Sequence, residues 1–190
     1  SGPDGRFNGS PPGGPNSNLY LGMSWAAVGS TPFRRFKHFT HEGGIAAPLV
    51  AHWPRGIPAN RRNALERQPA HLIDVMPTLI DVTGASYPRE FKGQAIQPME
   101  GVSLRPAFVG QSLRRTRPLF WEHEGNRAVR AGNWKLVSTY PDDWELYDLN
   151  TDYAETKNVA ADHRDKVIEM VGRWWAEAGK YGVMPIDGSM

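Results

Sequence analysis

The chain of 190 residues contains no cysteine. Disulfides, zinc sites with thiolate ligands and a cysteine nucleophile are therefore excluded within it. No apolar run approaches the roughly 18 residues that a membrane-spanning helix needs, and no apolar core follows a basic start, as it would in a signal peptide. The lack of cysteine does not define the compartment, because periplasmic proteins can lack it too.

A strong excess of one charge is also missing, since the net charge is only +2. The small excess is uneven: residues 1–70 hold eight Lys and Arg against three Asp and Glu. A basic first third suits an anionic substrate or an acidic partner. Nucleic-acid binding would require clustered basic residues in a recognised module. Arg61-Arg62 and Arg114-Arg115 are isolated pairs, so we expect neither a nucleic-acid nor a membrane partner.

The first half of the chain alternates between polar loops and short periodic stretches. Gly, Pro, Ser and Asn dominate residues 1–18, which predicts an irregular segment. The short apolar run Leu49–Trp53 predicts a buried strand that ends at Pro54. Its exposed edge would be an aggregation hazard, and we expect contacts between copies of the chain to cover it.

A helix is predicted from Asp74 to Thr83, where Asp74 can cap the start and Gly84 can end the last turn. A strand followed by a helix predicts the last β-α piece of a larger α/β sheet. The predicted buried stripe of this helix consists of Val75, Leu79 and Val82.

The last third of the chain predicts a small antiparallel sheet packed on one long helix. Gly132-Asn133 is typical of a tight hairpin turn. The expected strands are Leu119–Glu122, Arg127–Ala131, Trp134–Thr139 and Glu145–Leu149, and the expected helix is Asp162–Lys180. The apolar stripe of that helix is expected to contain Val167, Val171, Trp174 and Ala178, widened by Ile168 and Trp175.

These patterns predict an α/β remnant followed by an α+β part. We expect an irregular segment at residues 1–18, the end of an α/β domain at 19–100, and the sheet-plus-helix subdomain at 101–190.

The most informative motif is a lysine, Lys37, placed five residues before Glu42-Gly43-Gly44. Adjacent glycines allow backbone geometry in which side chains would clash. A lysine held before such a turn can meet an anion. The motif resembles the segment that supplies a sulfate-binding lysine in type I sulfatases.

Further stretches resemble the same family and follow in its order. Together they cover about residues 19–181 and are similar to the C-terminal part of arylsulfatase-like enzymes of the alkaline phosphatase superfamily. The stretches are Asp74–Leu79, Gly101–Leu104, Gly132–Val137 and Glu145–Leu149.

The resemblance implies catalytic groups that this chain does not show. The family makes formylglycine from Cys or Ser in a Cys/Ser-x-Pro-x-Arg signature, and it binds Ca²⁺ through Asp-Asp and Asp-Asn pairs. The stretch Ser30–Arg34 has the bare spacing, but it lies too close to Lys37 to be the signature, and no Asp-Asn pair is present. We therefore expect the nucleophile and the metal ligands upstream, no catalytic residue or metal ligand in this chain, and no activity of the chain alone.

The resemblance implies that Lys37 binds the sulfate. His41 and Arg34 are further candidates for contact with the anion, and His123 is a candidate for substrate specificity. Each also has an ordinary structural explanation, such as a surface ion pair or a polar group at a strand end. A metal site at His38 and His41 is disfavoured, because the glycine pair interrupts a helix and no third ligand is fixed by spacing.

The predicted function is hydrolysis of sulfate monoesters by the parent enzyme, with Ca²⁺ and formylglycine as its cofactors and a small-molecule sulfate ester as its partner. Two alternatives remain open at this point: a phosphonate or phosphodiester hydrolase of the same superfamily, and a non-catalytic accessory module. The resemblance also implies a periplasmic or secreted parent.

Overall fold

The computed structural model describes residues 11, 14 and 22–184. By its internal contacts the chain divides into two units. Unit 1 combines Ser1–Ala47 with Phe120–Met190, and unit 2 is Pro48–Leu119. Most of the expected irregular segment at residues 1–18 lies outside the described residues, and the domain boundaries expected at residues 18 and 100 stay predictions. None of the described helices combines the length and apolar character needed to cross a membrane.

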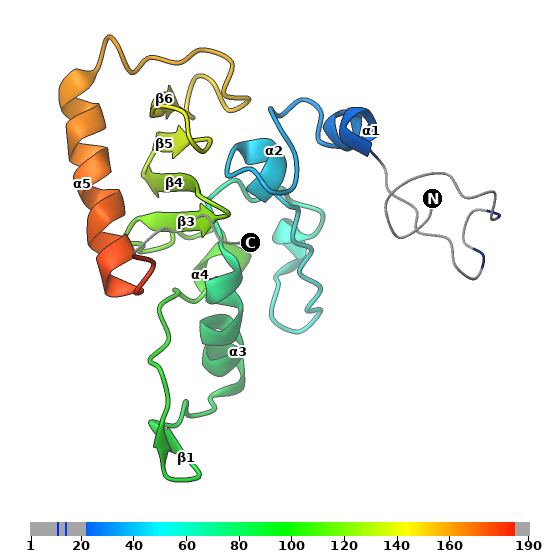
Figure 1. Cartoon of the computed structure of the whole chain (residues 1–190). Helices are drawn as coiled ribbons and strands as arrows, with labels where there is room; N and C mark the ends of the chain where they lie inside the picture. Colours follow the sequence, from blue (N-terminus) through cyan, green and yellow to red (C-terminus); the bar gives the residue numbers. More distant parts are fainter. Residues whose placement is uncertain (1–10, 12–13, 15–21, 185–190) are drawn as a thin grey trace. The chain divides into compact units, whose positions relative to one another are not determined.

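Unit 1 is built on a four-stranded sheet whose strands follow one another in chain order (Figure 1). β4, β5 and β6 pair antiparallel, and Gly132 has a φ of 60° in the turn between β4 and β5. The predicted strands are confirmed to within one residue at each end. The strands are β3 (Leu119–His123), β4 (Asn126–Ala131), β5 (Trp134–Ser138) and β6 (Glu145–Asp148).

The helix α5 (Arg164–Lys180) packs on one face of this sheet (Figure 1), which confirms the predicted sheet on a long C-terminal helix. The stripe prediction is wrong for Ile168, which is 70% exposed, and for Trp175. Both lie about 100° or more around the helix from Trp174, beyond the face that meets the sheet. The buried core between helix and sheet consists of Val129, Leu136, Leu146, Met170, Trp174 and Ala178.

The opposite face of the sheet meets a segment from the start of unit 1. Lys135 pairs with Tyr147, and Val137 pairs with Glu145, in the β5–β6 register. Because side chains alternate along a strand, these residues point away from the face that α5 covers. The loop before α2 (Glu42–Ile45) packs there through contacts of Arg34, His41 and Glu42 with β5 and β6. Both faces of the sheet are therefore covered.

Unit 2 contains short elements joined by loops. The predicted helix is confirmed as α3 (Val75–Thr83), and Gly84 ends it with a φ of 69°. A small hairpin, which the sequence did not predict, pairs β1 with β2. The remaining elements are η1 (Ala59–Arg61), η2 (Leu72–Asp74), β1 (Glu90–Phe91), β2 (Gln94–Ala95) and α4 (Arg105–Phe108); α1 (Gly22–Gly29) belongs to unit 1.

The predicted strand at Leu49–Trp53 is wrong. This run lies in no helix or strand, and Leu49 and Val50 are exposed. A strand exists only with a hydrogen-bonding neighbour, and the described part of the chain provides none for it. The expectation that contacts between copies cover this edge remains untested.

Two details of α3 also differ from the prediction. Asp74 does not cap this helix. Its buried carboxylate instead accepts hydrogen bonds from the backbone N–H groups of His71 (2.7 Å) and Val102 (2.9 Å) and pairs with the guanidinium of Arg115. Asp74 therefore joins the two family-like stretches at 74–79 and 101–104 within unit 2. The predicted buried stripe is wrong for Val75, which is 36% exposed, and for Leu79, which is 50% exposed, because no described element covers that face.

We expect Leu136→Ala to lower the free energy of unfolding by about 2–5 kcal/mol, because it removes a fully buried side chain from the core under α5. Urea unfolding followed by tryptophan fluorescence measures the change. Ile168→Ala is the matched control on the exposed side of α5 and should change stability by less than about 0.5 kcal/mol. Equal losses for the two variants would contradict the packing described here.

Candidate functional site

Lys37 lies on an irregular loop between helices α1 and α2 and is exposed. The neighbouring residues Arg35 and His38 have positive φ angles of 65° and 86°, which are uncommon for residues other than glycine. Among the described residues, no hydrogen bond or ion pair involves the Lys37 ammonium group. A cation without a partner, carried on a tightly turned loop, is available to an external anion.

The glycine pair lets this loop lie directly against α2. A Cβ atom at Gly43 would lie 2.2 Å from the carbonyl oxygen of Arg34, and one at Gly44 would lie 1.9 Å from that of Phe39. Neither glycine has a positive φ, so close backbone approach is the reason for glycine here. The Gly43 N–H also donates to the Arg34 carbonyl at 3.0 Å. The loop that carries Lys37 is thus held against the start of α2.

A buried triad of charges connects α2 to the sheet. Lys135 Nζ lies 2.7 Å from Glu42 Oε1 and 2.7 Å from Glu155 Oε1. The backbone N–H of Glu42 donates to Glu155 Oε2 at 2.7 Å. Lys135 and Glu155 are 0% exposed, and burial raises the pKa of Glu155 against the opposing charge of Lys135. The triad therefore fixes α2, and with it the end of the Lys37 loop, on β5.

A second network lies beside the triad and centres on Glu145. His41 Nε2 lies 3.0 Å from Glu145 Oε2, and the Tyr147 hydroxyl donates to the same oxygen at 2.8 Å. Burial by itself would raise the pKa of Glu145, but the hydrogen bonds from His41 and Tyr147 and the charge of Arg34 lower it. Arg34 also donates to the carbonyl oxygen of Glu155 at 3.0 Å, so it links the network to the segment that contributes to the triad.

Burial determines the charge of His41. The side chain is 1% exposed, and burial lowers its pKa to about 4 although the nearby Glu145 carboxylate raises it. His41 is therefore neutral at pH 7. Its Nδ1 atom is buried and has no partner among the described residues.

The four candidate site residues from the sequence fall into three places. Arg34 and His41 lie inside the network around Glu145, Lys37 is exposed, and His123 is exposed at the end of β3. Their roles toward a substrate stay predictions. Glu42 has a structural role, because its carboxylate pairs with the ammonium group of Lys135.

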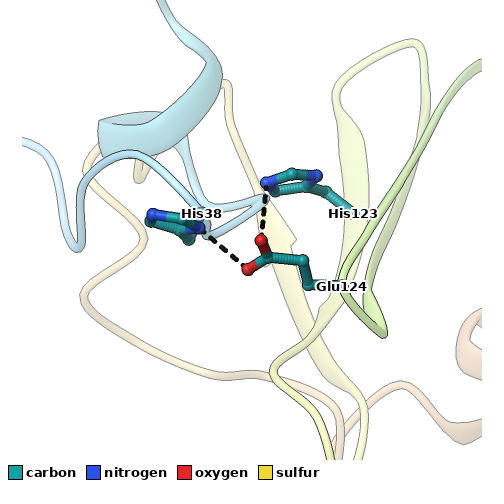
Figure 2. Close-up of side chains that lie close together, drawn as sticks. All are labelled: His38, His123 and Glu124. Carbon is teal, nitrogen blue, oxygen red and sulfur yellow. Dashed lines mark hydrogen bonds and ion pairs between the residues drawn. The ribbon is translucent and has the colours of Figure 1, made fainter. Parts of the chain in front are cut away.

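His123 lies near His38 and Glu124, although His38 comes from the Lys37 loop (Figure 2). Glu124 Oε2 lies 2.8 Å from His38 Nδ1, and Glu124 Oε1 lies 3.7 Å from His123 Nε2. These three residues, here called the two-histidine cluster, are the one group of three or more His, Asp or Glu in the described part of the chain whose possible ligand atoms lie close enough together to share a metal ion. This group was not predicted from the sequence, since no spacing rule joins residues 38 and 123.

The described residues do not fit the Ca²⁺ site that the family implies. Ca²⁺ takes six to eight oxygen ligands, whereas the two-histidine cluster offers two nitrogens and one carboxylate. Ser30, the serine of the bare signature spacing, donates its hydroxyl to the Ala26 carbonyl at 3.1 Å, just past the end of α1. Ser30 therefore does not lie at a helix start, where the family's nucleophile precursor is expected.

Two residues that support the Lys37 loop, Lys135 and Glu155, were not predicted from the sequence. Lys135 had no distinctive signal, because a polar residue between the apolar residues Trp134 and Leu136 of a predicted strand is typical of a solvent-facing position. Glu155 had none, since it lies in a loop with no periodicity.

We expect Lys135→Met to lower the free energy of unfolding at pH 7 by about 3–5 kcal/mol, because it leaves the Glu42 and Glu155 carboxylates buried without a cation. Chemical unfolding followed by circular dichroism measures this loss. Lys157→Met, at an exposed lysine of the same unit, is the control and should be nearly neutral. The triple variant Lys135→Met, Glu42→Gln, Glu155→Gln should recover more than half of the loss. A single variant as stable as the wild type would contradict the triad.

The depressed pKa of His41 predicts a loss of stability in acid. Below about pH 6.5 the unfolded chain binds a proton at His41, while the folded chain does so only near pH 4. The contribution of His41 to the free energy of unfolding is therefore fully present above about pH 6.5 and is lost as the pH drops toward 4. Between pH 7 and pH 5 this residue lowers the free energy of unfolding by about 2 kcal/mol. The His41→Gln variant should show a loss smaller by that amount when unfolding is measured at both pH values. His163→Gln, at an exposed histidine, should keep the wild-type pH dependence.

The chain is similar in sequence to known sulfatases. The family described as N-sulphoglucosamine sulphohydrolase, C-terminal, matches residues 33–173. An uncharacterized sulfatase of Schizosaccharomyces pombe is 29% identical over 89% of this chain and 31% of its own length. A sulfatase of Formosa agariphila is 31% identical over 70% of the chain and 26% of its own length. A choline-sulfatase of Rhizobium meliloti is 32% identical over 70% of the chain and 25% of its own length.

A solved structure has a similar fold. The crystal structure of Ps i-CgsB in complex with k-i-k-neocarrahexaose matches with a TM-score of 0.62 and 25% identity, over 80% of this chain and 32% of that chain. The chain thus spans about a quarter to a third of the length of these relatives. The family match covers the Lys37 loop, the sheet and most of α5, so the chain belongs to the N-sulphoglucosamine sulphohydrolase C-terminal family, the C-terminal part of sulfatases in the alkaline phosphatase superfamily.

Proposed function

We propose that this chain supplies the lysine-bearing part of a sulfatase active site, and that the enzyme containing it hydrolyses sulfate monoesters. In this proposal Lys37 binds the sulfate group. The observation that carries it is the unpaired ammonium group of Lys37 on a loop that Gly43, Gly44 and the Lys135 triad hold against the sheet. Membership of a sulfatase family supports the same assignment.

The chemistry of the reaction requires such a cation. A sulfate monoester carries negative charge on three non-bridging oxygens, and hydrolysis adds charge to the leaving oxygen. Positive groups that are already in place stabilise this charge without reorganisation. Lysine offers a compact charge with three donors, and the supports of its loop limit the entropy lost when it meets the anion.

The residues around Lys37 restrict which neighbours can assist it. Arg34 is engaged by Glu145, Tyr147 and the Glu155 carbonyl, and His41 is buried and neutral at pH 7. We therefore assign Lys37 the direct contact with sulfate, and we assign Arg34 and His41 the support of its loop.

The leaving group is proposed only as a class. The relatives include a choline-sulfatase, N-acetylgalactosamine-6-sulfatases and an arylsulfatase D, whose names specify different leaving groups joined to a common sulfate. The family assignment supports a sulfate ester as the substrate, but it does not specify the leaving group. An aryl sulfate is a convenient test substrate, and an arylsulfatase-like preference is part of the proposal.

We further propose that formylglycine and a Ca²⁺ ion, which the family implies, are provided by residues outside this chain. The chain has no cysteine, and the described residues do not form an oxygen-rich cation site. The 190 residues alone should accordingly show no turnover of an aryl sulfate.

The test is Lys37→Ala in the polypeptide encoded by the complete reading frame. We expect kcat/KM for 4-nitrophenyl sulfate to fall by about 10²–10³-fold, as for the loss of one charge-stabilising donor. Lys157→Ala, at an exposed lysine of the same unit, should retain wild-type kinetics.

A matched assay with 4-nitrophenyl phosphate and a phosphonate monoester distinguishes the reaction classes. Faster cleavage of either one than of the sulfate would contradict sulfatase function. Unchanged sulfate hydrolysis in Lys37→Ala would contradict the proposed role of Lys37, but it would leave the proposed sulfatase function in place.

A further inference from the structure

The two-histidine cluster joins two segments that are far apart in the sequence. His38 follows Lys37 on the loop before α2, while His123 and Glu124 lie at the end of β3 and in the turn to β4. The His38 and His123 rings are stacked, with centroids 5.6 Å apart and planes at 21° (Figure 2). The possible ligand atoms of the three residues all lie within 4.8 Å of one another.

These separations suit a small divalent metal. Zn–N and Zn–O bonds are about 2.0–2.2 Å long, which places tetrahedral ligands about 3.3 Å apart. Glu124 Oε2 lies 2.8 Å from His38 Nδ1, and Glu124 Oε1 lies 3.7 Å from His123 Nε2, on either side of that value. Side-chain rotation is needed to bring one donor atom of each residue to a single ion.

The backbone of the cluster is fixed by neighbouring contacts. The buried Asn126 side chain donates from Nδ2 to the His38 carbonyl at 3.0 Å and accepts from the Tyr140 N–H at 3.2 Å. Glu124 holds a positive φ of 52°, in addition to that of His38. Such angles cost about 1–3 kcal/mol each and persist only where the surroundings impose them. The two ligand-bearing segments are thus joined before any ion arrives.

We propose that His38, His123 and Glu124 form a binding site for one divalent transition metal of the Zn²⁺ class. Imidazole nitrogen favours Zn²⁺, Ni²⁺ and Cu²⁺ over Ca²⁺ and Mg²⁺. Two histidines and one carboxylate leave a fourth position open to water or another ligand. The cluster is exposed, so an ion reaches it without an opening of the fold.

A metal ion at this site would change the charge of the loop that carries Lys37. His38 directly follows Lys37 in the chain, so a bound ion places a second positive charge on the segment that carries the unpaired ammonium group. The metal site itself is independent of the proposed sulfatase function, because its ligands do not include Lys37.

The experiment is a Zn²⁺ titration of the untagged chain by isothermal titration calorimetry at pH 7.5, with Co²⁺ absorption spectra as a second readout. We expect one saturable Zn²⁺ site and the visible bands of tetrahedral Co²⁺. His38→Asn, His123→Gln and Glu124→Gln should each weaken binding by more than about tenfold. Asparagine is chosen at residue 38 because it tolerates positive φ.

His52→Gln and His163→Gln, at exposed histidines outside the cluster, are the matched controls and should bind Zn²⁺ as the wild type does. Circular dichroism checks that each variant is folded, and Glu124→Gly, which suits the positive φ, replaces Glu124→Gln if the latter is not. Absence of a saturable site, or equal binding by the cluster variants and the wild type, overturns the proposal. Ca²⁺ binding of equal affinity at the same residues also overturns it.

Discussion

The buried ammonium group of Lys135, held between Glu42 and Glu155, is the interaction on which the arrangement of unit 1 depends. A lysine without solvent is costly unless its charge is compensated, and the two carboxylates come from separate segments of the chain. The charge is compensated only when α2 and the loop around Glu155 have both docked on β5. Buried ion pairs add little net stability compared with apolar side chains, but the charges of this triad are compensated only in the docked arrangement. The loop with Lys37 is positioned by the same docking, because it packs on the glycines that follow Glu42.

The two faces of β5 have different roles: one contributes to the apolar core, and the other holds the Lys37 loop. Leu136 faces α5 and belongs to the apolar core, whereas Lys135, one residue earlier, faces the Lys37 loop. A shift of the strand register by one residue would exchange these faces and bury Leu136 among charges. Both faces therefore select the same register, one by apolar burial and the other by charge compensation. This double selection explains how a short sheet can hold an irregular loop in a defined place.

Local patterns carried the predictions that the structure confirms. The hairpin at Gly132, the alternation of β5 and β6, and the periodicity of α5 each depend on residues close in the chain. The strand at Leu49–Trp53 failed because an apolar run becomes a strand only beside another strand, and the described residues supply none. The partners of Lys135 lie 93 residues before it and 20 residues after it, where no spacing rule applies. The motif around Lys37 was recognisable from the sequence, but the reason for its glycines, close backbone approach, required coordinates.

Lys135 and Lys37 carry the same ammonium group, but their environments give them different roles. Lys135 is neutralised by two carboxylates and has no capacity left for an external anion. Lys37 is unpaired, but in water a charge about 4 Å from an anion contributes only about 1 kcal/mol, compared with about 4 kcal/mol near a protein surface of lower dielectric. A net charge of +2 adds little long-range attraction. In the proposed role of Lys37, its contribution would therefore depend on groups that exclude water from the sulfate. The anchored loop places the charge, and the rest of an active site must supply the low dielectric in which that charge is effective.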